Sequence, residues 1–141
     1  GMRFDHAECN NHYARPLSIW GAYASRLGLR VDAIRGDLAI LMPGQDTYKG
    51  AFITATGIGK LSFRGRKKST KIRLLLHEGH QLIGRLTLPL KPPTGIATVT
   101  VGGQSVAADA DVRDGLATLT FAAPLMLRAE TELKAVLKGA E

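Results

Sequence analysis

Apolar residues near the N-terminus recur at the spacing of an α-helix. The apolar positions are Leu17, Trp20, Ala24 and Leu27. Residues three and four positions apart lie on one face of a helix, so this pattern predicts a helix over 15–27 with one apolar face. Pro16 suits the first turn of a helix, and Gly28 stands where a left-handed C-terminal cap is expected. The apolar face has to pack against something.

From residue 29 onward the apolar residues alternate with polar ones, which is typical of β-strands. The expected strands cover residues 29–33, 38–41, 48–54, 60–63, 71–77, 82–88, 96–101, 104–108, 116–121 and 133–137. Tight turns are predicted at the Gly102-Gly103 pair and at Asp114-Gly115. A further turn is expected at residues 78–80, and the prolines at 92–93 predict a break in the sheet.

This succession of short strands and turns predicts the fold class. About nine or ten strands after a single helix favour a mainly β protein, an antiparallel β-sandwich with one N-terminal helix. The 141 residues are enough for one compact domain with its own core. No internal repeat or low-complexity stretch suggests another architecture.

Positive charge is concentrated in one part of the chain. The sequence has 19 Lys and Arg against 12 Asp and Glu, a net charge of +7. A run without any acid holds Lys60, Arg64, Arg66, Lys67, Lys68, Lys71 and Arg73. We expect residues 64–69 to form a solvated basic loop at a hairpin tip. The alternative is a polyanion-binding module built on residues 64–73, with Arg64, Arg66, Lys67 and Lys68 as anion ligands and Phe63 stacking on a base.

Other features of the sequence exclude several kinds of chemistry. Cys9 is the only cysteine, so the chain has no intrachain disulfide. We expect a cytoplasmic location, because the chain shows neither a membrane-spanning apolar run nor a signal peptide. His77 and His80 are three positions apart around a glycine, not four apart on a helix, and Gly57 and Gly59 lack the third glycine of a dinucleotide loop. We therefore predict no metal and no cofactor.

The segment at residues 8–20, Glu-Cys-Asn-Asn-His-Tyr-Ala-Arg-Pro-Leu-Ser-Ile-Trp, carries a family resemblance. It resembles the late, sugar-facing segment of glycoside hydrolase family 116, the β-glucosidase and non-lysosomal glucosylceramidase family, and the likeness extends over about residues 4–63. The resemblance implies that Glu8 and Arg15 hydrogen-bond sugar hydroxyls. It also places His12, Tyr13 and Trp20 among the substrate-binding residues, with the aromatic rings facing the sugar.

The chain is too short for the helical barrel of that family, and the family's catalytic carboxylates lie upstream of this segment. The resemblance therefore implies a non-catalytic piece, with residues 1–28 as a loop and barrel-closing helix and residues 29–141 as the β-sandwich. It predicts a partner on the helix at 15–27, either a separate barrel subunit or a second copy. The alternatives are a stand-alone carbohydrate-binding sandwich and the polyanion-binding module; one short basic loop does not favour nucleic acid as a partner.

Overall fold

The computed structural model describes residues 14–66, 69–90 and 95–139. These residues form one helix and ten strands. The elements are α1 (Ala14–Leu27), β1 (Leu29–Asp32), β2 (Asp37–Ile40), β3 (Thr47–Ile53), β4 (Gly57–Arg66), β5 (Ser69–Pro89), β6 (Gly95–Val101), β7 (Gln104–Val106), β8 (Asp109–Arg113), β9 (Leu116–Arg128) and β10 (Glu132–Gly139). The expected mainly β fold with one N-terminal helix is confirmed.

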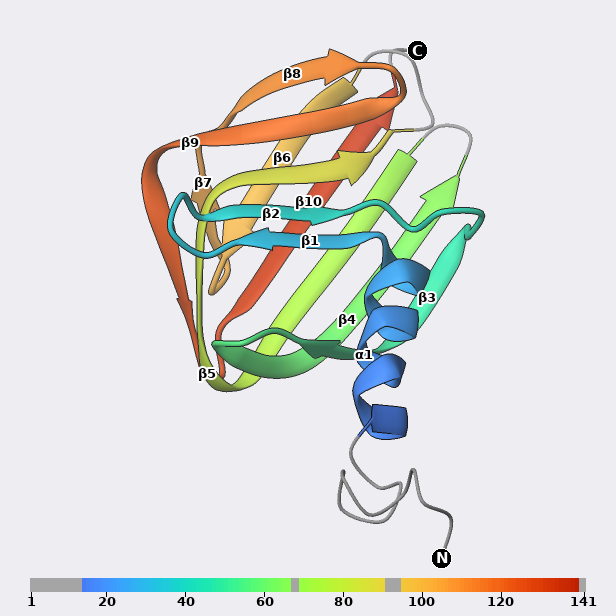
Figure 1. Ribbon diagram of the computed structural model, residues 1–141. Coiled ribbons are helices and arrows are strands. Elements are labelled where there is room, and N and C mark those ends of the chain that lie inside the picture. Colours follow the sequence, from blue (N-terminus) through green and yellow to red (C-terminus); the bar gives the residue numbers. More distant parts are fainter. Residues whose placement is uncertain (1–13, 67–68, 91–94, 140–141) are drawn as a thin grey trace, which may run out of the picture.

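The strands form two layers that share β5. The front sheet in Figure 1 has the order β1-β2-β5-β9-β8. The rear sheet has the order β3-β4-β5-β10-β6-β7. Figure 1 shows that the front strands run across the rear ones. Buried leucine, isoleucine and phenylalanine side chains from both sheets form the core.

A single bent strand connects the two sheets, where the sequence predicted two strands around a turn at 78–80. β5 is 21 residues long and changes partners at its middle, from β4 and β10 to β9 and β2. Gly79 has a φ of 75° at this point. The prediction of a turn was wrong because a glycine at positive φ serves a bend in a strand as well as a chain reversal, and the local pattern does not separate the two.

One ladder departs from the expected antiparallel pairing. β2 runs parallel to β5, with Asp37 opposite Arg85, whereas the other ladders are antiparallel. β2 forms a hairpin with β1, and it then joins the sheet by burying Leu38 and Ile40. The neighbour of a strand is chosen by the core that it completes, and alternation within the strand does not specify that neighbour.

The helix is held at its C-terminal end. Leu27 is fully buried, and its carbonyl accepts hydrogen bonds from the backbone N–H groups of Leu41 and Met42. The hydroxyl of Tyr23 donates to the carbonyl of Ala51 in β3 at 3.0 Å. The same hydroxyl accepts a hydrogen bond from the N–H of Ile53 at 2.9 Å. The attached face of α1 therefore includes Tyr23, which lies outside the apolar stripe predicted from sequence.

Candidate functional site

The outer face of the rear sheet is formed by alternate residues of β4 and β5. On β4, Leu61 and Phe63 point into the core while Lys60, Arg64 and Arg66 are exposed. On β5 the same alternation buries Ile72 and Leu74 and exposes Lys71 and Arg73. Successive side chains of a strand point to opposite faces, so every base of this pair of strands lies on the solvent side.

The strand register brings bases from four strands onto this surface. Arg64 lies opposite Lys71, and Ser62 lies between Lys49 of β3 and Arg73 of β5. On the other side of β5, Lys134 of β10 is opposite Arg73. We call the following set of eight exposed bases the basic face: Lys49, Lys60, Arg64, Arg66, Lys71, Arg73, Lys134 and Lys138.

The basic face is a broad, open surface. Neighbouring strands are about 4.8 Å apart and alternate residues of a strand about 6.7 Å apart, so the face is roughly 14 Å wide and roughly 20 Å long. Residues 47–51, 60–66, 69–75 and 132–138 contribute one acid, Glu132. Arg73 binds it at 2.7 Å and Lys134 approaches it at 3.7 Å. Within the described part of the chain, the other six bases have no ion-pair partner.

A groove of about 890 Å³ crosses the basic face over β3, β4, β5 and β10. Small residues, including Ala51, Gly59 and Ser62, are among those that line it. Longer side chains also line the groove: Lys49, Lys60, Arg64, Arg73, Leu75, His77 and Glu132. The absence of bulky side chains between long ones leaves the surface hollow. The groove therefore combines cationic groups, one carboxylate and apolar contact area.

The structure corrects the prediction of a basic loop. Arg64 and Arg66 belong to β4, which continues to Arg66, while Lys67 and Lys68 lie outside the described residues. Alternation with Leu61, Phe63 and Gly65 makes this polar segment a strand with one buried face. Phe63 is 2% exposed, so the predicted stacking of its ring on a base was wrong.

Sequence reasoning missed three members of the basic face. Lys49, Lys134 and Lys138 come from strands far from residues 60–73 in the chain. The signal present was the alternation of lysine with buried apolar residues in β10, where Leu133, Ala135 and Leu137 point inward. Only the pairing of β10 with β5 places that lysine row beside Lys71 and Arg73.

Most of the predicted sugar-binding residues lie outside what the structure describes. Glu8, His12 and Tyr13 lie outside the described residues, and so does the side chain of Arg15, whose backbone is in α1. Trp20 is 50% exposed on α1, and its ring meets the ring of Tyr23 edge-on at a centroid distance of 6.4 Å. The sugar site therefore stays a prediction.

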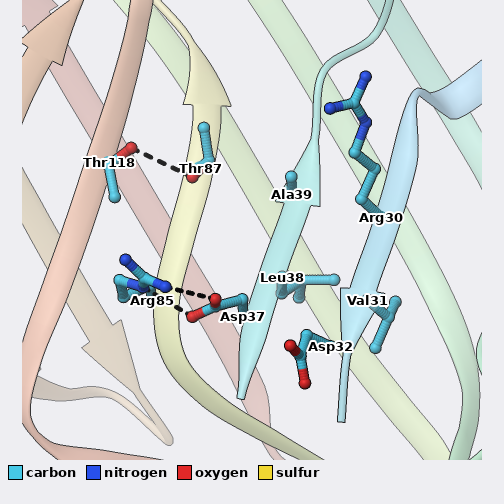
Figure 2. A pocket seen from close by; sticks show the side chains of 9 residues that line it. All are labelled: Arg30, Val31, Asp32, Asp37, Leu38, Ala39, Arg85, Thr87 and Thr118. Carbon is cyan, nitrogen blue, oxygen red and sulfur yellow. Dashed lines mark hydrogen bonds and ion pairs between the residues drawn. The ribbon is translucent and has the colours of Figure 1, made fainter. Parts of the chain in front are cut away.

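A smaller hollow of about 360 Å³ lies on the outer face of the front sheet (Figure 2). Figure 2 shows Arg85 and Asp37 pointing toward each other, and the Arg85 Nε donates to Asp37 at 2.7 Å. This hydrogen bond lowers the pKa of Asp37 below its ordinary value. Asp32 also lines the hollow, and Thr87 and Thr118 bond to each other at 3.2 Å. Because Arg85 is neutralised by Asp37, this hollow is a weaker anion site than the basic face.

The described residues were also compared with the requirements of a metal site and of a membrane-spanning helix. No group of three or more His, Cys, Asp or Glu side chains in that part of the chain is arranged to hold a metal ion. The Nδ1 atom of His77 in β5 lies 3.5 Å from the Oε1 atom of Glu130, in the turn between β9 and β10. No helix within the same residues is long and apolar enough to cross a membrane.

No protein-family model matches the chain, and no curated protein matches it either.

Proposed function

We propose that this protein binds a polyanion through the basic face. One observation carries the proposal: eight exposed bases from four paired strands share a surface on which the corresponding strand segments have a single acid. Such a concentration of one sign of charge attracts polymers of the opposite sign and raises their association rate. The polyanion-binding alternative drawn from residues 64–73 is thereby widened to β3 and β10.

The dispersed charges favour a polymer over a small anion. An exposed ion pair contributes about 1 kcal/mol or less, so one anionic group on this surface is held weakly. A polymer contacts several bases at once and releases the counterions condensed on it, so its total binding free energy is large. The roughly 20 Å length of the face suits several successive charges of an extended chain.

The salt dependence of binding tests this function. Fluorescence anisotropy with a labelled polyanion, either dextran sulfate or a DNA duplex, should show log K falling linearly with log salt concentration. Six phosphate contacts on a duplex would give a slope of about −5. Uncharged dextran should not bind. A flat salt response with dextran sulfate and with the duplex would remove the proposal.

A second candidate function is favoured by the exposed side of α1. Ile19 is 66% and Trp20 50% exposed, so this side of the helix has apolar area without a partner among the described residues. This agrees with the expected role of the chain as a non-catalytic piece related to family 116 glycosidases, with α1 contacting a barrel subunit or a second copy. The stand-alone carbohydrate-binding alternative would use Trp20 itself as the sugar platform.

Sedimentation equilibrium separates these uses of the helix. If α1 pairs with a second copy, the protein should form a dimer at high concentration, and the double variant Ile19→Ser/Trp20→Ser should be monomeric. The paired substitution removes the two large apolar groups, including the ring that meets Tyr23 edge-on, and keeps the hydrogen bonds of the Tyr23 hydroxyl that anchor the helix. If the wild-type protein is a monomer at high concentration, α1 does not pair with a second copy. Quenching of Trp20 fluorescence by added glucosides would instead favour Trp20 as the surface that binds sugar.

A further inference from the structure

We propose that the polyanion is an acidic polysaccharide, a chain of sugar rings carrying sulfate or carboxylate groups, and that it lies in the groove of the basic face with Glu132 accepting hydrogen bonds from its hydroxyls. This inference rests on the proposed polyanion binding and specifies the class of polymer. Nucleic acid is the competing class. Three features of the groove distinguish the two.

The first feature is the mixture of surfaces in the groove. Ala51 and Leu75 provide apolar contact area, and Leu75 lies directly opposite both Lys60 of β4 and Glu132 of β10. A sugar ring has an apolar C–H face and a rim of hydroxyls, so it needs apolar area and hydrogen-bonding groups close together. The backbone of a nucleic acid duplex offers mainly charged phosphates at its surface. The row of Lys60, Leu75 and Glu132 therefore matches a charged sugar better than a phosphate.

The second feature is the carboxylate itself. Glu132 is held in place by Arg73 and Lys134, and its side chain is 30% exposed in the groove. An ionised carboxylate only accepts hydrogen bonds. Sugar hydroxyls donate to it, whereas phosphate oxygens have nothing to donate and are repelled by its charge. The one acid of the basic face thus favours a polymer that carries donors as well as negative charges.

The third feature is that the outward positions of the described parts of β3, β4, β5 and β10 carry no Phe, Tyr or Trp ring. Among the residues that line the groove, the one ring is the imidazole of His77, which pairs with Glu130. Phe52 and Phe63 point into the core from β3 and β4. Proteins that bind single-stranded nucleic acid usually stack its bases on aromatic side chains. Within the described residues, this face also presents no helix or protruding ribbon that could enter the major groove of a duplex. The described part of the face thus lacks both the large aromatic rings on which bases stack and a protruding element that could read a duplex.

Glu132→Ala tests the class of polymer, because it should change the affinities for a DNA duplex and for an acidic polysaccharide in opposite directions. Loss of the negative charge should raise the affinity for a random-sequence DNA duplex several-fold. Loss of the hydroxyl acceptor should lower the affinity for dextran sulfate or polygalacturonate, so that the ratio of polysaccharide to duplex affinity falls about tenfold. The two polysaccharides show whether sulfate or carboxylate groups are preferred. Glu132→Gln, which preserves the shape of the side chain, should lower the same ratio by a smaller factor.

Glu130→Ala is the matched control. Glu130 is an acid two residues away that pairs with His77 and does not line the groove. Its removal changes the net charge equally, so both affinities should rise together and their ratio should stay constant. If Glu132→Ala and Glu132→Gln also leave the ratio constant, the polysaccharide assignment is overturned while polyanion binding stands. If wild-type protein binds neither polymer, polyanion binding itself fails.

Discussion

Replacing Lys49, Arg64 and Lys71 together by glutamine should weaken binding of a DNA duplex or dextran sulfate about a hundredfold at roughly 0.1 M salt. These bases come from three adjacent strands, are exposed and have no ion-pair partner within the described residues. Each base that no longer contacts the polymer also lowers the number of counterions released on binding. The slope of log K against log salt for the duplex should therefore become shallower by about three.

A control with the same change in net charge uses bases of the front sheet. Arg30, Arg35 and Arg113 lie away from the basic face, on β1, in the β1–β2 turn and on β8. Their replacement by glutamine should change the affinity little, because surface charges beyond about 10 Å are largely screened at this salt concentration. An equal loss of affinity in both triple variants would show that net charge governs binding and that the basic face has no special part in it.

Gly79→Ala should lower the free energy of unfolding by about 3 kcal/mol or more, since strain at positive φ and a backbone clash add together. Gly79 has a φ of 75°, and a Cβ there would stand 2.1 Å from the carbonyl oxygen of Thr56. That carbonyl also accepts the N–H of His80 at 2.9 Å. The clash therefore falls at the bend where β5 passes from the rear sheet to the front sheet, and urea unfolding followed by circular dichroism measures its cost.

Gly44→Ala provides the matched comparison. Gly44 also has a positive φ, 68°, but a Cβ there meets nothing within 4 Å. The free energy of unfolding should therefore fall by only about 1 kcal/mol, the cost of placing an alanine at positive φ. If the two variants are destabilised equally, the close packing at the bend of β5 does not contribute to stability, and the bend is held by other contacts.

Local features of the sequence were sufficient for the elements that depend on near neighbours. Helical spacing and Gly28 predicted α1, which ends at Leu27 with Gly28 at a φ of 56°. The Gly102-Gly103 and Asp114-Gly115 pairs predicted turns, and all four residues have positive φ. These signals are local because a turn or a cap is decided by the conformations open to a few consecutive residues.

Pairing between distant strands decided the features that the sequence left open. The bend in β5, its parallel ladder with β2 and the insertion of β10 between β5 and β6 all depend on which strands complete a common core. Alternation established that Lys71 and Lys134 each lie on the solvent side of a strand. Only the register placed them on neighbouring strands of one sheet.

The charge of the chain illustrates the same division. The sequence by itself determined an excess of bases near residues 60–73 and a mainly β fold, because composition and alternation are properties of the chain alone. The tertiary structure decided that Lys49, Lys134 and Lys138 join those bases and that Glu132 lies among them. The physical reason is that burial of apolar side chains selects which strands pair. The polar residues on the opposite face of the sheet become neighbours as a result.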